Sequence, residues 1–171
     1  MKTVCKRNLI EYSTKICDNF NSFSQLFGEF GYAHTFFDKL TLHFITEAGI
    51  KIGNNENKIL DYHLGGLGEN YINTFIPFYG YEFGSLTGDA YLLSTLKGRY
   101  NLFKNHYLLW AASAARIDDD LYNEGRLFEN TKIGFGLGYG IDSFLGPIEL
   151  NLTYSPDTDK NYWYFNLGYW F

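Results

Sequence analysis

The stretch that most restricts the fold of this 171-residue chain is residues 161–171. It reads Asn-Tyr-Trp-Tyr-Phe-Asn-Leu-Gly-Tyr-Trp-Phe, with a large apolar side chain at every second position. This alternation predicts a β-strand. One face of that strand is wholly apolar and the other is mixed, and the apolar face carries Trp163, Phe165, Leu167, Tyr169 and Phe171. An uncovered apolar face of this kind is suited to contact with lipid.

The composition is compatible with a chain that crosses a membrane as strands. Aromatic residues make up 20% of the sequence, and 18 residues are glycine. The mean hydropathy is only -0.22, but a spanning strand needs about 9 to 11 residues with alternate positions apolar, so its average stays low. No run of about 18 apolar residues occurs, which excludes a transmembrane helix. The expected fold class is therefore an all-β antiparallel transmembrane barrel, or the C-terminal half of one.

Period-two alternation predicts seven strands and a candidate eighth at residues 8–17. We expect residues 1–22 to form an irregular segment or first strand, and residues 23–171 to form the barrel domain with a long external loop at 53–89. The seven predicted strands are residues 24–37, 40–52, 90–102, 106–117, 131–142, 148–155 and 162–171.

The lengths of the connections support a barrel. Outer-membrane barrels have short periplasmic turns and longer external loops. If the last strand ends on the periplasmic side, the long connections 53–89 and 118–130 both fall outside, together with residues 156–160. The connections predicted to be periplasmic are residues 38–39, 103–105 and 143–147.

Several kinds of site are not supported by the sequence. A net charge of -5 with 14 scattered Lys and Arg residues argues against a nucleic-acid partner. Cys5 and Cys17 lack the spacing of metal ligands and either pair or stay free. The four histidines have no paired spacing, so we interpret them as lumenal or interfacial side chains; they are His34, His43, His63 and His106.

The acidic stretch 118–120, with Glu124 and Glu129, lacks the glycine and closing glutamate of a calcium loop. A solvated external loop is the favoured interpretation. We therefore expect no metal and no cofactor.

Four glycines recur with a strict period of two in the strand predicted at 131–142, at Gly134, Gly136, Gly138 and Gly140. They lie on one face, whereas a phosphate loop needs successive amides that converge at a helix start. Close approach of another segment to the inner wall explains them better, and the loop around residues 79–81 is the candidate. Charged residues share this interior face and are expected to pair in the lumen, with an ion pathway as the alternative; they are Glu47, Lys97, Arg99 and Glu149.

An ordered set of motifs carries a family resemblance over roughly residues 20–171. Residues 61–66, 75–83, 86–91, 138–140 and 144–150, with the terminal strand, resemble the C-terminal barrel of patatin-like phospholipases of Bacteroidetes. That barrel is similar to the outer-membrane assembly and two-partner-secretion barrels, also called bacterial surface antigens. The resemblance implies an outer-membrane location and contacts with membrane lipid and the barrel-assembly machinery.

The resemblance also implies roles for particular residues. A Gly-Gly pair leads into an external loop that folds back into the lumen, and the loop tip corresponds to Phe78, Tyr79, Gly80 and Tyr81. The arginine of that family tip is absent here, and with it the lumenal ion pair it would make. Phe165, Leu167, Tyr169 and Phe171 correspond to a C-terminal insertion signal.

Five strands follow the loop, so the chain corresponds to about the last half of a sixteen-strand barrel. This correspondence agrees with the missing secretory signal at residues 1–10. The open edges would be completed by the remainder of a larger barrel or by a homo-oligomer.

No chemistry for catalysis is found in the chain. A patatin-like hydrolase needs a Gly-x-Ser-x-Gly nucleophile elbow and a Ser-Asp dyad, and the chain has neither that elbow nor an Asp-Gly dipeptide. The leading hypothesis is a non-catalytic translocator or membrane-anchor barrel, whose parent would be a lipid acyl hydrolase. The alternatives are a free-standing small outer-membrane barrel for adhesion or structure, and a soluble lipid-binding β-barrel.

Overall fold

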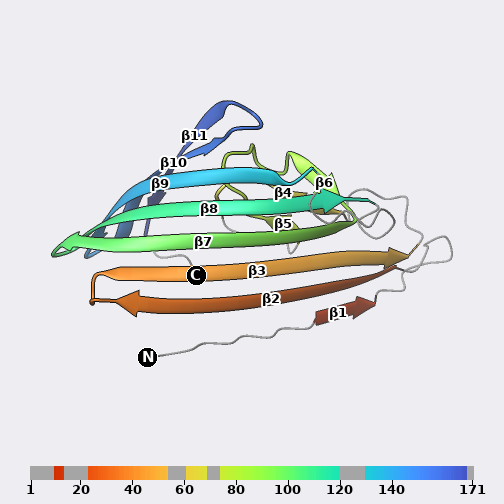
Figure 1. Ribbon diagram of the computed structural model, residues 1–171, viewed down its shortest axis with the longest axis horizontal. Coiled ribbons are helices and arrows are strands. Elements are labelled where there is room, and N and C mark those ends of the chain that lie inside the picture. Colours follow the sequence, from red (N-terminus) through yellow and green to blue (C-terminus); the bar gives the residue numbers. More distant parts are fainter. Residues whose placement is uncertain (1–9, 14–22, 54–60, 69–73, 120–129, 169–171) are drawn as a thin grey trace.

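The computed structural model describes residues 10–13, 23–53, 61–68, 74–119 and 130–168. Eight strands form one antiparallel sheet in the order β1-β2-β3-β7-β8-β9-β10-β11, so each strand pairs with its neighbour in this order (Figure 1). The strands are β1 (Ile10–Ser13), β2 (Phe23–Phe36), β3 (Leu40–Gly53), β7 (Ala90–Phe103), β8 (His106–Asp118), β9 (Lys132–Ser143), β10 (Gly146–Ser155) and β11 (Lys160–Leu167). The predicted all-β antiparallel class is confirmed.

Three short strands lie in the long connection between β3 and β7. They are β4 (Tyr62–Leu64), β5 (Phe75–Ile76) and β6 (Leu86–Gly88), and they form a separate sheet in the order β5-β4-β6. The sequence predicts a loop at residues 53–89, because two- and three-residue strands are too short to show a period. We call the described part of residues 61–89 the insertion.

The register defines two faces of the large sheet. Glu29 lies opposite Glu47, and His43 lies opposite Lys97. Ser113 lies opposite Gly134 on the same face. The insertion packs against this face, which we call the inner face; the alternate residues form the outer face.

The connections divide the sheet into two ends. The β2–β3, β7–β8 and β9–β10 hairpins have two or three connecting residues and lie at one end, the turn end. The connections 54–89, 119–131 and 156–159 lie at the opposite end, the loop end. Short hairpins therefore alternate with longer connections along the chain, and the two kinds lie at opposite ends of the sheet.

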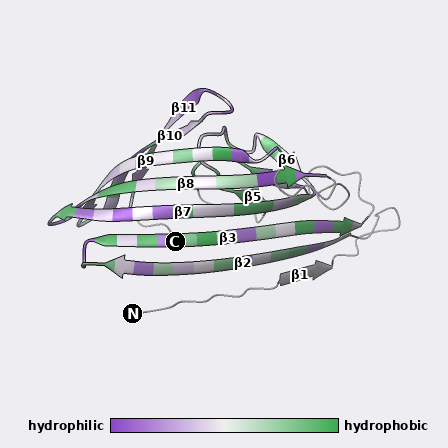
Figure 2. Ribbon diagram, in the orientation of Figure 1, coloured by the Kyte–Doolittle hydropathy of each residue, from purple (hydrophilic) through white to green (hydrophobic). Residues whose placement is uncertain are grey.

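The outer face is apolar along nearly its whole extent. Leu137 is 62% exposed, Trp163 is 65% exposed and Phe165 is 69% exposed. Figure 2 shows hydrophobic and hydrophilic residues alternating along the long strands, as a sheet with one apolar face requires. The other outer-face apolar residues that are exposed include Leu26, Phe30, Tyr32, Phe36, Phe44, Ile52, Leu92, Leu96, Tyr100, Leu102, Leu108, Ile133, Phe135, Tyr139, Leu150 and Leu167.

The sheet is open, because β1 and β11 are its two edges and do not pair with each other in the part of the chain described. It therefore forms a curved wall and not a closed cylinder. No helix among the described residues is long and apolar enough to cross a membrane.

Candidate functional site

The insertion has its own small core at the loop end of the inner face. Leu64 and Phe78 are fully buried, and they cluster with apolar residues of β7 and β8. Tyr91, Leu93 and Ala115 supply the wall side of this core. The insertion is thus a packed element, and its burial explains why these inner-face positions are apolar.

The insertion reaches the inner wall through its tip, residues 78–81. A Cβ atom at Gly134 would overlap the carbonyl oxygen of Tyr79, and one at Gly136 would lie 2.5 Å from the Tyr79 ring. Gly80 has a φ of 75°, and a side chain there would overlap the backbone at Tyr154. The tip therefore requires glycine on both sides of the contact.

The other two glycines of β9 have different neighbours. A Cβ atom at Gly138 would overlap the Asn151 side chain, and one at Gly140 would overlap the Tyr107 ring. These two glycines accommodate side chains of adjacent strands, whereas Gly134 and Gly136 accommodate the insertion.

The tip is held by the connection between β10 and β11. The Tyr81 hydroxyl donates a 2.6 Å hydrogen bond to Asp157 Oδ2, and Thr158 Oγ1 donates to the carbonyl oxygen of Gly80 at 3.2 Å. Burial and the bond to Asp157 raise the pKa of Tyr81 to about 12, so its hydroxyl stays protonated and can donate. Tyr81 is the last residue of the predicted tip, whereas no pattern in the sequence predicts its partner Asp157.

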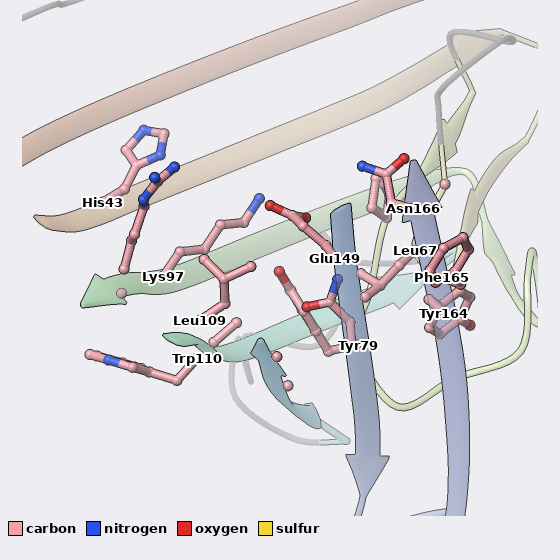
Figure 3. Close-up of a pocket in the computed structure, with 18 of the residues that line it drawn as sticks. His43, Leu67, Tyr79, Lys97, Leu109, Trp110, Glu149, Tyr164, Phe165 and Asn166 are labelled. Carbon is pink, nitrogen blue, oxygen red and sulfur yellow. The ribbon is translucent and has the colours of Figure 1, made fainter. Parts of the chain in front are cut away.

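A cavity of about 500 Å³ lies beneath the tip on the inner face (Figure 3). Leu67, Pro77 and Tyr79 of the insertion form one side of it. Six strands line the rest of the cavity, β3 and β7 to β9 on one side and β10 with β11 on the other. The side chains that the wall presents to the cavity include one apolar residue, Leu109, and five charged or polar residues: His43, Lys97, Arg99, Asn151 and Asn166.

Two of the charged groups in this cavity are already paired. Arg99 Nη2 lies 2.8 Å from Asp142 Oδ2, and the Arg99 guanidinium lies 3.6 Å from the Tyr107 ring centroid. The Tyr107 hydroxyl donates to Glu149 at 2.8 Å. Burial, and then the charge of Glu149, raise the pKa of Tyr79 to about 12. The four predicted inner-face charges do lie on one face, where Arg99 and Glu149 both contact Tyr107 and Glu47 acts electrostatically on Lys97.

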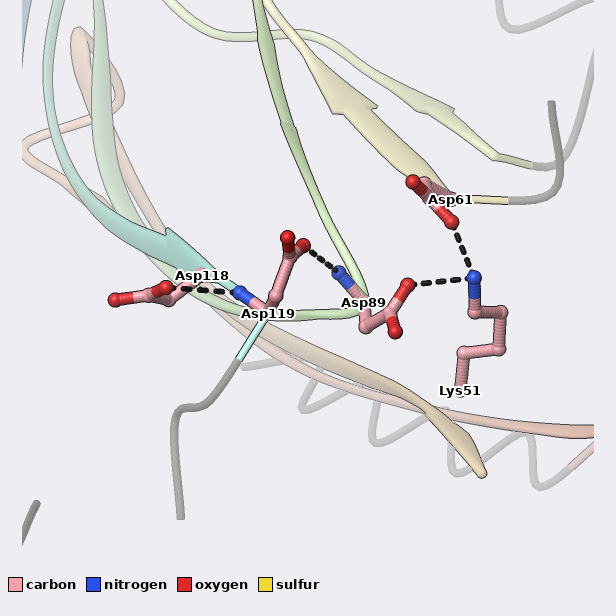
Figure 4. Close-up of polar contacts among 5 residues, drawn as sticks. All are labelled: Lys51, Asp61, Asp89, Asp118 and Asp119. Carbon is pink, nitrogen blue, oxygen red and sulfur yellow. Dashed lines mark hydrogen bonds and ion pairs between the residues drawn. The ribbon is translucent and has the colours of Figure 1, made fainter. Parts of the chain in front are cut away.

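A second polar cluster closes the base of the insertion (Figure 4). Lys51 at the end of β3 makes ion pairs with Asp61, which precedes β4, and with Asp89, which precedes β7. Its side chain is 2% exposed. Asp61, Asp89 and Asp119 have carboxylate oxygens within 4.8 Å of one another, and the Lys51 ammonium supplies the positive charge there. Only long-range pairing brings Lys51 to both ends of the insertion, so no local pattern in the sequence predicts this cluster.

The remaining predicted site residues are dispersed. His34 and His106 lie on the outer face, His63 stacks on Phe75 in the insertion, and only His43 lines the cavity. Phe165 and Leu167 are exposed on the outer face of β11. Tyr169, Phe171, Cys5, Cys17, Glu124 and Glu129 lie outside the described residues.

The family model of the OMP85 superfamily matches residues 3–171, almost the whole chain. The chain belongs to the OMP85 superfamily. A search of curated proteins finds none that matches. Membership, together with the all-β antiparallel sheet, makes this OMP85 chain an outer-membrane domain of the β-barrel type. Domains of the superfamily are generally non-enzymatic and work with the outer-membrane assembly machinery.

Proposed function

We propose that this OMP85 chain is the membrane-embedded wall of a translocator or anchor barrel, with its outer face in lipid and its insertion in the lumen. The observation that carries this proposal is the outer face, where exposed apolar side chains recur on β2, β3 and β7 to β11. Water-exposed apolar surface of this extent is costly for a soluble protein, whereas lipid solvates it. Most charged and amide side chains of the strands lie on the other face, which suits a polar lumen; Arg116 of β8 is an exception.

Leu108 and Leu109 test this orientation, because they are neighbours in β8 and point to opposite faces. Leu108→Arg should reduce the yield of heat-modifiable barrel in outer-membrane fractions, since an arginine facing the lipid core costs about 2–4 kcal/mol. Leu109→Arg puts the same charge in the lumen and should leave most of the yield. A soluble barrel with an apolar interior predicts the reverse order, and that result would overturn the proposal.

We also propose that this wall is the membrane part of a patatin-like phospholipase. The ordered motifs between residues 61 and 150 support the idea, and the lack of a nucleophile elbow would put the hydrolase in another part of the protein. An antibody against the 118–130 loop should then detect a native protein much larger than 19.8 kDa that co-purifies with lipid acyl hydrolase activity. A native band at 19.8 kDa without that activity would rule out this parent.

The assembly machinery is the proposed partner of the last strand. Phe165 and Leu167 alternate outward, and Tyr169 and Phe171 continue the pattern in the sequence. Removing Phe171 should lower membrane insertion. Normal insertion without Phe171 would show that this residue is not part of a signal.

A further inference from the structure

The lumenal cavity combines an apolar surface with an unpaired positive charge. Leu67, Pro77 and Leu109 give it apolar walls, and its volume of about 500 Å³ falls within the range of about 300–1,000 Å³ typical of small-molecule sites. The insertion bounds the cavity on one side, and the strands of the large sheet bound it on the other. A cavity bounded in this way can enclose a compact ligand.

Lys97 is the cation of the cavity that is free to meet a ligand. Arg99 is already bound to Asp142, but no hydrogen bond or ion pair within 4.0 Å joins Lys97 to any residue that the structure describes. Glu47 and Glu29 act on Lys97 electrostatically, yet neither lines the cavity. The Lys97 ammonium therefore keeps donors for an anionic group.

The opposite wall adds amide groups and one carboxylate. Asn166 Nδ2 is buried without a hydrogen-bond partner among the described residues. Glu149 lies directly opposite Asn166 in the β10–β11 register, and Asn151 also lines the cavity. The one carboxylate in the lining, Glu149, already accepts from Tyr107. A buried donor without an acceptor, as at Asn166, favours a ligand that supplies acceptor oxygens.

We propose that this cavity binds a small organic anion, with its carboxylate near Lys97 and the amide donors, and its apolar body against Leu67, Pro77 and Leu109. The site goes beyond the proposed role of the chain as a membrane wall. A carboxylate satisfies the ammonium and amide donors together, and charge-assisted bonds of this kind are the stronger ones. The apolar body displaces water from the leucine and proline surfaces.

The test uses the full-length protein in lipid nanodiscs and the soluble probe 2-naphthoate, with empty nanodiscs as the reference. Calorimetric titration should give saturable binding with one site per chain. Lys97→Gln should weaken binding about tenfold or more, since one charge-assisted hydrogen bond is lost. Lys97→Arg keeps the charge and should retain binding within a few fold. The matched control is Lys160→Gln, which removes an exposed lysine at the loop end and should leave binding unchanged.

Two competitors, added to the unaltered protein, test whether binding needs both the carboxylate and the apolar body of the probe. The neutral 2-naphthamide should not compete, and inorganic phosphate at equal concentration should not displace the probe. Equal binding of the amide, displacement by phosphate, or an unchanged affinity in Lys97→Gln would each overturn the proposal. Heat-modifiable mobility of the same samples reports separately on the membrane wall, so a failed ligand site is distinguishable from a failed barrel assignment.

Discussion

Glycines of β9 determine how closely the insertion can approach the wall. The side of Gly134 on the inner face is occupied by the Tyr79 backbone, whereas Gly28 on the outer face of β2 has nothing within 4 Å of an added Cβ atom. Both glycines lie in long strands of the same sheet, so they differ mainly in what faces them. Comparing alanine substitutions at Gly134 and Gly28 therefore separates the free-energy cost of a clash with the insertion from the general effect of adding a side chain to a strand.

Gly134→Ala should destabilise the folded protein by about 1–3 kcal/mol, because the backbone of Tyr79 must move to accommodate the methyl group. Urea unfolding in detergent micelles measures this change. Gly28→Ala is the control and should be neutral or slightly stabilising. Equal effects of the two substitutions would mean that the tip does not rest on Gly134.

The hydrogen bond from the Tyr81 hydroxyl to Asp157 also holds the tip in place. Tyr81→Phe removes the donor to Asp157 and should loosen the insertion by about 1–3 kcal/mol, since hydrogen bonds to charged groups are worth this much. Limited proteolysis at the exposed residues 82–83 should then become faster. Tyr100→Phe on the outer face serves as the control. An unchanged cleavage rate in Tyr81→Phe would contradict a holding role for this bond.

At the scale of elements, alternation located the long strands to within a few residues. The strand predicted at residues 90–102 corresponds to β7 (Ala90–Phe103), and the one at 131–142 corresponds to β9 (Lys132–Ser143). A half-exposed sheet imposes a period of two on every strand, so the sequence carries this information locally. β2 ends at Phe36, one residue before the predicted end of the strand, and Phe37 begins the hairpin with a φ of 52°.

The insertion could not be predicted from the alternation. Tyr91 and Leu93 are apolar residues on the otherwise polar inner face of β7, and both pack in the core of the insertion. That contact joins segments whose proximity depends on the whole fold. The tip position and the glycine face were suggested by the sequence, whereas Asp157 and the Lys51 cluster were not, because nothing local distinguishes them from other surface charges.

The base of the insertion depends on one cation between two carboxylates. Lys51→Met should destabilise the protein by about 3–5 kcal/mol, because it leaves Asp61 and Asp89 buried or half-buried without a counter-charge. Denaturant unfolding measures the loss, and Lys104→Met at an exposed hairpin is the control. Adding Asp61→Asn to Lys51→Met should recover part of the stability. No recovery would show that the ion pair with Asp61 is not what Lys51 contributes.

At the scale of the whole molecule, the sheet is a wall with two open edges. Unpaired backbone groups at β1 and β11 are not tolerated in lipid, so a membrane-embedded form needs additional strands to close it. We propose that these strands come from the remainder of a larger barrel or from a second copy. Native mass spectrometry of the protein extracted in detergent distinguishes the two: a single longer chain indicates the former, and a multiple of one chain indicates the latter. A barrel closed by one copy of these 171 residues would contradict both.

The central claim is that the apolar outer face contacts lipid and the polar inner face contacts water. Single cysteines at Leu137 and Leu150 on the outer face, and at Lys97 and Asn151 on the inner face, can be spin-labelled after Cys5 and Cys17 are replaced by serine. In liposomes, the outer labels should be relaxed mainly by oxygen, which concentrates in lipid. The inner labels should be relaxed mainly by a water-soluble nickel chelate. Outer labels that respond to the nickel chelate and not to oxygen would contradict the account.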